Sequence, residues 1–183
     1  MARIMHENGG LCFVDFAASA PYVEMNMHPD DPMEKLDAIF FSPHKFLGGP
    51  GSSGIMLFDR SLYKSSAPDQ PGGGTVEWTN PWGEYKYVDN IESREDGGTP
   101  AFLQMIRAAR AIRLKEQMGT EKIKAREEEL LDKTFRGLSA IKGLHILAPN
   151  VRHRLGAVSF YIDGLHYNLV VKLLSDRYGI QVR

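Results

Sequence analysis

The chain has 183 residues, a net charge of −1 and one cysteine, and 43% of its residues are apolar. This length suits one sizeable domain, or one domain and part of another, and the apolar content favours a packed core over disorder. The charge argues against nucleic acid or an anionic membrane as the main partner, and one cysteine excludes an intrachain disulfide framework. Because no apolar run approaches a membrane span and the start lacks the apolar stretch of a signal peptide, we expect a cytoplasmic protein.

The first part of the chain is predicted to form a short helix and three strands. The helix covers residues 2–7, and the strand-like apolar runs are 11–16, 38–41 and 54–58. Such nearly continuous apolar runs are typical of strands covered on both faces, as in a parallel sheet. These runs therefore indicate the central sheet of an α/β fold.

The middle of the chain is predicted to form a long loop and two helices. Residues 64–99 are rich in Gly, Pro, Asn, Ser and Trp and show no clear periodicity. A loop of this length inside a compact domain is more often functional than idle. Helices are predicted from Pro100 to about Met118, where Gly119 ends the pattern, and over 120–141, where apolar residues share one face.

The last part of the chain has the pattern of a second, α+β unit. We predict strands over 144–147, 157–162 and 180–183, and a helix over 166–178 between the last two. This unit is expected to begin within the long helix over 120–141.

Asp15 is the first candidate for a binding residue. It closes the run 11–16, and the small residues Ala17–Ala20 follow it. A carboxylate at the carboxyl end of a sheet strand lies where α/β folds place ligands. Taken alone, an aspartate in this position is more commonly a turn or helix-cap residue.

Lys45 is the second candidate, and its surroundings are more specific. It ends the sequence Ser42-Pro43-His44-Lys45, which follows the run 38–41 and precedes a glycine-rich turn. An amine in this position can form a Schiff base with an aldehyde cofactor, while a hydroxyl and an imidazole can donate to its phosphate. A pyridinium cofactor also needs an anion at its ring nitrogen. Asp15 follows the preceding strand run, so one pocket is expected to hold both sites.

Four segments carry a resemblance to a known family. They are Val14–Ala20, Phe41–Lys45, Gly97–Pro100 and Gly179–Arg183. In these segments the chain resembles class V aminotransferases of the pyridoxal phosphate (PLP) fold-type I superfamily, which includes cysteine desulfurases and selenocysteine lyases. The resemblance implies the second half of a PLP-binding large domain over 1–120, a mainly parallel sheet with helices. It also implies a linking helix and the start of a small α+β C-terminal domain over 121–183.

The resemblance implies a role for each residue around the cofactor. Lys45 would be the Schiff-base lysine and would later shuttle the α-proton of the substrate. Asp15 would keep the pyridine nitrogen of PLP protonated, and Ser42 and His44 would bind the phosphate. The family often has Gln three residues after the aspartate, where this chain has Ala18.

Two further residues are assigned by resemblance alone. Thr99 would reach the phosphate of the neighbouring subunit's cofactor in a homodimer with shared active sites. Arg183 would pair with the α-carboxylate of a small amino-acid substrate, where a guanidinium fork suits a planar anion. Cysteine desulfurase or selenocysteine lyase chemistry is the leading hypothesis, and transamination and other eliminations stay open.

The resemblance also supports an alternative. The half of the large domain that supplies a phosphate-binding turn and a ring-stacking residue is expected before Met1, and a family loop is expected after Arg183. In cysteine desulfurases that loop carries the sulfur-accepting cysteine. The chain is therefore alternatively a catalytically silent fragment, or a truncated paralogue that acts in dimerisation or binding.

Other conspicuous residues have simpler interpretations. Cys12 lies inside the first apolar run and is expected to pack in the core. The histidines show no ligand-like pairing, so no metal site is expected. Gly72–Gly74 lacks the context of a P-loop and is predicted to be a mobile loop near the cofactor. Trp78 and Trp82 line the site or a subunit interface, or else pack under the long loop.

Overall fold

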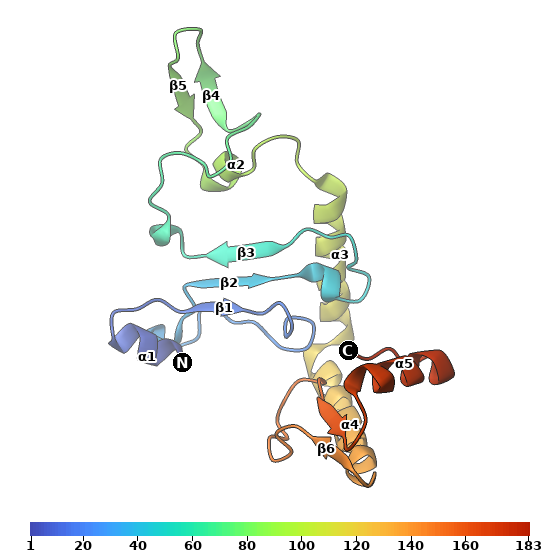
Figure 1. Ribbon diagram of the computed structural model, residues 1–183. Coiled ribbons are helices and arrows are strands. Elements are labelled where there is room, and N and C mark those ends of the chain that lie inside the picture. The colour runs from blue at the N-terminus through green and yellow to red at the C-terminus, as the bar shows by residue number, and fades with distance from the viewer. The chain divides into compact units, whose positions relative to one another are not determined.

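The structure is a computed structural model that describes residues 1–183 and divides into two compact units, Met1–Met118 and Gly119–Arg183 (Figure 1). The helices and strands of the first unit are α1 (Ala2–Glu7), β1 (Phe13–Asp15), β2 (Ala38–Phe41), β3 (Ile55–Phe58), β4 (Val76–Thr79), β5 (Tyr85–Tyr87), α2 (Ile91–Glu95) and α3 (Phe102–Met118). Those of the second unit are α4 (Thr120–Ser139), β6 (Leu144–Ile146), β7 (Phe160–Ile162) and α5 (Tyr167–Tyr178).

The first unit is built on a three-stranded sheet with β2 in the centre (Figure 1). β1 pairs with β2 in parallel, with Asp15 opposite Phe40, while β3 pairs with β2 in the antiparallel direction, with Ile55 opposite Phe41. The α/β class is confirmed, but the sheet of this chain is mixed. The connection from β2 to β3 contains only a 3-10 turn, η2 (Pro43–Lys45), and a glycine turn, so no crossover helix brings the chain back for a parallel pairing.

Burial differs between the central strand and its neighbours. Ala38, Ile39 and Phe41 of β2 are buried, whereas Phe13 of β1 is 53% exposed and Met56 of β3 is 57% exposed. The prediction of strands covered on both faces is therefore wrong for β1 and β3 within this chain. Each of these strands pairs only with β2, and no element of the chain covers its outer side chains.

The core of the first unit lies directly beneath the ends of β1 and β2. Its buried cluster is formed by Ala20, Ile39, Phe41, Phe46 and Ala111. These residues come from the turn after β1, from β2, from the residue after η2, and from α3. Because alanine has a small side chain, α3 can approach the turn after β1 closely at this point.

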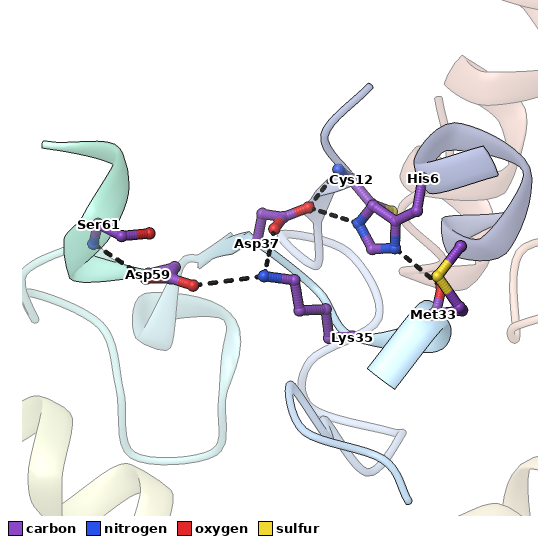
Figure 2. Close-up of polar contacts among 7 residues, drawn as sticks. All are labelled: His6, Cys12, Met33, Lys35, Asp37, Asp59 and Ser61. Atoms are coloured by element: carbon purple, nitrogen blue, oxygen red, sulfur yellow. Dashed lines mark hydrogen bonds and ion pairs between the residues drawn. The ribbon is translucent and has the colours of Figure 1, made fainter. Parts of the chain in front are cut away.

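At the opposite ends of β1 and β2, a buried carboxylate joins several elements (Figure 2). The side chain of Asp37 is 1% exposed. Its Oδ2 accepts a hydrogen bond from the Cys12 amide at 2.7 Å and lies 2.8 Å from Nε2 of His6, while Oδ1 pairs with Lys35 Nζ at 3.2 Å. Burial acts to raise the pKa of Asp37, but these partners outweigh it and lower the pKa to about 2.

His6 completes this Asp37 network from α1 (Figure 2). Its Nδ1 lies 2.8 Å from the Met33 carbonyl, and its Nε2 faces Asp37. A carbonyl and a carboxylate only accept hydrogen bonds, so this arrangement favours the protonated imidazole, in which both ring nitrogens donate. The hydrogen bond to Asp37 first, and that to Met33 second, raise the pKa of His6. Lys35 extends the network to Asp59 at 3.4 Å.

The segment predicted to be a long loop contains regular structure. Residues 76–87 form the antiparallel hairpin of β4 and β5, and α2 follows it. The strands are rich in aromatic residues, which favour strands, and Tyr85 and Tyr87 contact each other edge to face. The side chain of Asn90 caps α2 by accepting from the Ser93 amide at 2.8 Å. Because this segment is rich in Gly and Pro, neither the hairpin nor α2 was predicted from the sequence.

The second unit combines a hairpin and two helices. β6 pairs with β7 in the antiparallel direction, and Phe135 of α4 is buried beneath the guanidinium of Arg152, whose carbon lies 4.1 Å from the ring centroid. The strand predicted over 180–183 is wrong: after the left-handed cap at Gly179 that follows α5, residues 180–183 are in no strand. None of the helices in the chain combines the length and the apolar character that a membrane span requires.

Candidate functional site

Parallel pairing brings Asp15 and the segment Ser42–Lys45 to one edge of the sheet. β1 ends at Asp15 and β2 ends at Phe41, and the two strands run in the same direction. The ladder continues one residue further, because the Phe16 amide donates to the Phe40 carbonyl at 2.9 Å. The carboxylate and the lysine therefore leave the sheet at the same end, where ligands bind in open α/β sheets.

Asp15 begins a compact turn and keeps one oxygen free. Its Oδ1 accepts a hydrogen bond from the Ala17 amide at 2.7 Å, which is the geometry of an Asx turn. The side chain is exposed, and its Oδ2 takes part in no hydrogen bond within the protein. The common turn role of aspartate is thus present here, and it holds the carboxylate in one orientation.

Buried residues on either side orient the side chains of η2 outward. Pro43 and Phe46 are buried, whereas His44 and Lys45 are exposed. Ser42 is half-buried and caps the turn only through its carbonyl, which accepts from the Lys45 amide at 3.0 Å. The side chains of Ser42, His44 and Lys45 make no hydrogen bond or ion pair with the rest of the chain. All three remain available to a ligand.

The turn after Lys45 depends on a close approach of two backbone segments. A Cβ atom at Gly49 would lie 1.8 Å from the Pro43 carbonyl oxygen, so no other residue fits without moving the backbone. In the same turn, the hydroxyl of Ser52 is buried without a hydrogen-bond partner. No pattern in the sequence singled out Ser52. A buried hydroxyl without a partner is uncommon, and it adds a free donor to this turn.

Thr99 follows a second close backbone approach. The Gly98 amide donates to the Gly73 carbonyl at 2.9 Å, and a Cβ atom at Gly97 would lie 2.7 Å from the Gln70 carbonyl oxygen. Thr99 itself is exposed, and its side chain makes no hydrogen bond. Glycine at position 97 therefore sets the path of the chain into Thr99 and α3.

The glycine run predicted to be a mobile loop forms the other side of this crossing. Thr75 is 1% exposed and donates from its hydroxyl to the Gly72 carbonyl at 2.7 Å. Gly72–Gly74 is thus a hydrogen-bonded turn against Gly97 and Gly98. Its role in the structure is to support the segment that precedes Thr99.

The remaining sequence predictions have mixed outcomes. Arg183 is exposed in the second unit, whereas the other five predicted site residues belong to the first. Cys12 is 5% exposed, which confirms its place in the core. Trp78 and Trp82 lie on the hairpin, where they are 49% and 84% exposed, so they do not pack under a loop. No group of three or more His, Cys, Asp or Glu side chains gathers as a metal site requires.

Lys115 of α3 is a residue near the site that sequence reasoning missed. Its Nζ donates to the carbonyl of Ala20 at 2.6 Å and to that of Val23 at 2.5 Å, both in the turn after Asp15. The only available signal was a charged residue one turn beyond the buried Ala111 on the face that packs on the core.

The free groups at this edge match the requirements of a pyridine aldehyde phosphate. Such a cofactor needs an anion at its ring nitrogen, an amine for its aldehyde and donors for its phosphate. Asp15 offers an anion, Lys45 an amine, and Ser42 and His44 hydrogen-bond donors, and none of these side chains is neutralised by an ion pair within the chain. Ala18 is small and exposed, so it leaves room beside Asp15. The residues present therefore fit the cofactor.

Comparisons with known proteins extend over the whole chain. The family model described as aminotransferase class-V matches residues 1–183. A probable cysteine desulfurase from Staphylococcus aureus is 30% identical over 179 residues, and one from Staphylococcus epidermidis is 31% identical over 177 residues. Each match covers 97% of this chain, which spans 41% of the length of either relative.

Solved structures show the same fold. The apo structure of a cysteine desulfurase from Thermococcus onnurineus matches with a TM-score of 0.85 and 30% identity, covering 100% of this chain and 44% of that protein. A cysteine desulfurase from Escherichia coli matches with a TM-score of 0.77 and 22% identity, covering 98% and 42%. A cystine C–S lyase solved with its reaction product, cysteine persulfide, matches with a TM-score of 0.70 and 24% identity, covering 91% and 42%.

Proposed function

Because the chain belongs to the class V aminotransferase family, we propose that it carries part of a PLP site that acts on an amino acid. The observation that carries this proposal is the edge of the sheet where Asp15 and Lys45 leave parallel, neighbouring strands. Their side chains are exposed, and no partner within the chain neutralises their charge. A site that holds a charged cofactor needs its charges free in this way.

We propose that four residues at this edge hold the cofactor. Lys45 is the Schiff-base lysine and later moves the α-proton of the substrate at its Nζ. Asp15 would pair with the ring nitrogen, and its Oδ2 is the oxygen that the Ala17 amide leaves free. Ser42 and His44 donate to the phosphate. When bound, PLP supplies an electron sink for the substrate's α-carbon.

Other parts of the proposal rest on the family. Thr99 contributes to the phosphate site of a second subunit in a homodimer, and Arg183 binds the substrate's α-carboxylate with its guanidinium fork. We propose that residues 1–120 belong to the large domain and 121–183 to the linking helix and the start of the small domain, and the division into compact units between Met118 and Gly119 supports this. The chain works in the cytoplasm, and nucleic acid and membranes are not its partners.

The substrate class follows from the relatives. We propose a small sulfur-containing amino acid and removal of its sulfur, because the two staphylococcal relatives are described as probable cysteine desulfurases. One structural neighbour, a mutant of the C-DES protein, was solved with glycine covalently linked to its PLP cofactor, which supports the same cofactor here. Selenocysteine cleavage and transamination are the alternatives within the family.

A specific observation favours a second candidate function. Phe13 and Met56 are more than half exposed on β1 and β3, and this chain spans less than half the length of its relatives. Exposed strand residues of this size are typical of surfaces that pair with another polypeptide. The second candidate is therefore a catalytically silent chain that acts in dimerisation or binding.

A titration with PLP separates the two candidates. The wild-type chain is expected to develop the absorbance of a protein-bound Schiff base near the visible edge, and Lys45→Ala is expected to lose it. Lys64→Ala is the matched control, because Lys64 is exposed and makes no ion pair. Absorbance that survives in Lys45→Ala would remove Lys45 from its role, and no absorbance from the wild type would favour the silent chain.

A further inference from the structure

Lys115 contacts the two segments that supply Asp15 and Lys45. It lies in α3, one turn beyond the buried Ala111, and its ammonium group donates to two carbonyls in the turn after Asp15. The ammonium also lies over the Phe46 ring, 5.7 Å from its centroid. Phe46 is the residue after Lys45, so one side chain touches both parts of the site.

The turn after Asp15 needs a cation at its end. Residues 16–23 form a helix-like turn in which the Phe16 carbonyl accepts from Ser19 and Ala20, and the Ser19 carbonyl accepts from Tyr22 and Val23. The carbonyls at the end of such a turn have no amide partner within it. Those of Ala20 and Val23 accept from no backbone amide, and the ammonium of Lys115 satisfies both. A positive charge is favourable there for the same reason as at a helix C-terminus.

The start of the same turn orients the Asp15 carboxylate. The Ala17 amide donates to Oδ1 of Asp15, and Ala20 is fully buried against Ala111 and Phe46 in the core cluster. Lys115 therefore fixes the far end of the turn, while its near end holds the carboxylate. If the far end loosened, the Ala17 amide would lose its fixed direction toward Asp15.

Burial of the Lys115 ammonium costs desolvation free energy, which its contacts must offset. Desolvation lowers the pKa of Lys115, and the negative charges of Glu24 and Glu116 act against this shift. Two carbonyls and an aromatic face are the partners that a partly buried ammonium requires. A second cation of α3, Arg107, donates to the Pro50 carbonyl at 2.6 Å, in the turn that follows Lys45. α3 lies against η2 in the same unit (Figure 1).

We propose that Lys115 is a positioning residue that holds the Asp15 turn against the segment carrying Lys45, and so fixes where the ring-nitrogen anion stands relative to the Schiff-base amine. Its meaning for PLP rests on the function proposed above. Its mechanical part, the restraint of residues 16–23, is a property of this chain alone.

Hydrogen exchange in the absence of PLP tests the mechanical part. In Lys115→Met, the amides of Ala17, Ala20 and Val23 are expected to exchange about tenfold faster or more, because two hydrogen bonds from a charged donor are lost. Amides of β2 should keep their protection. Arg113→Met is the control, since Arg113 lies exposed on the same helix and makes no hydrogen bond or ion pair through its side chain. Unchanged exchange over residues 17–23 would overturn the proposal.

Two further variants protect this test against a folding defect. Lys115→Arg keeps the cation and several donors, so it should restore most of the protection. Lys115→Gln keeps a hydrogen-bond donor but removes the charge. If Lys115→Met does not fold, the exchange rates of Lys115→Gln are compared with those of the wild type instead. Faster exchange in the Gln variant supports the proposal, and exchange at the wild-type rate overturns it.

A double-mutant comparison of PLP affinity tests the link to Asp15. Lys115→Met is expected to weaken PLP binding about tenfold in the wild-type background, but less than about twofold when Asp15→Asn is already present. Equal losses in both backgrounds would show a general structural role and would overturn the positioning through Asp15. If the wild-type chain binds no PLP, the proposed function fails, while the exchange experiment still decides the role of Lys115.

Discussion

The two ends of the parallel pair β1–β2 use charged residues in opposite ways. At the amino ends, Asp37 is buried, and its carboxylate is matched by the Cys12 amide, His6 and Lys35 (Figure 2). At the carboxyl ends, Lys45 is exposed and unpaired within the chain, and Asp15 uses only one carboxylate oxygen. The charged residues at the amino ends join elements of the fold, whereas those at the carboxyl ends remain available to a ligand.

Substitutions at the two ends are therefore expected to have different effects. Removing one partner from a buried charged network leaves other polar groups without partners, which destabilises the fold. Removing an exposed, unpaired charge leaves the fold nearly unchanged, because no contact is lost. Substitutions at the amino ends should therefore change stability, and substitutions at the carboxyl ends should change ligand binding.

The largest effect on stability is expected for Asp37→Ala. The substitution leaves the buried Cys12 amide without an acceptor and removes the carboxylate that His6 and Lys35 share, so the free energy of unfolding should fall by about 3 kcal/mol. Urea unfolding followed by circular dichroism measures this loss. Lys45→Ala is the comparison, with a change within about 0.5 kcal/mol, because the exposed Lys45 side chain makes no hydrogen bond or ion pair within the chain. Equal losses in the two variants would break the distinction between the two ends.

The pH dependence of stability should report the same network. The pKa of Asp37 is lowered from 3.8 to about 2, so its contribution of about 2 kcal/mol is complete above pH 4 and is lost as the pH falls toward 2. The pKa of His6 is raised from 6.5, so its contribution is complete below that value and is lost as the pH rises through the raised pKa. Stability due to this network is therefore greatest between about pH 4 and pH 6.5.

Urea unfolding at several pH values checks this profile. Asp37→Asn should flatten the acid limb, and His6→Gln should flatten the alkaline limb, since each removes the group that titrates there. A wild-type profile that survives in both variants would assign the pH dependence to other groups.

A smaller effect is expected at the glycine crossing before Thr99. Gly97→Ala places a methyl group against the Gln70 carbonyl and should cost about 1–2 kcal/mol, because the backbone must move. Gly73→Ala is the matched control, since no atom lies within 4 Å of its Cβ position. Thermal unfolding of both variants measures the difference. Equal melting temperatures would show that the backbone crossing before Thr99 is not tightly packed. The rigid part of the site would then be restricted to β1 and β2.

Sequence reasoning worked best where neighbouring residues carry the signal. Asp15 and Lys45 each follow an apolar run, so their arrival at one edge of a sheet was predictable. The antiparallel direction of β3 was not predictable, because an apolar run does not indicate whether a strand pairs in parallel or antiparallel. The strand over 180–183 failed for a related reason, since a strand needs a partner that its own residues do not reveal.

Contacts between distant segments were the hardest to predict. His6 and Cys12 lie 31 and 25 positions from Asp37, too far for a local pattern to relate them to it. The same is true of Lys115 and the carbonyls of Ala20 and Val23, which are more than ninety positions away. The ligand roles of Asp15, Ser42, His44, Lys45 and Thr99 remain predictions, because they concern a bound cofactor.

The most direct test of the central claim is to map the lysine that bonds to PLP. The wild-type chain is incubated with PLP and reduced with borohydride, which fixes the Schiff base, and peptide mass mapping then locates the modified lysine. We expect one dominant modification, at Lys45, and its loss in Lys45→Ala with the fold retained by circular dichroism. Modification spread evenly over exposed lysines such as Lys64, or unchanged in Lys45→Ala, would contradict the assignment.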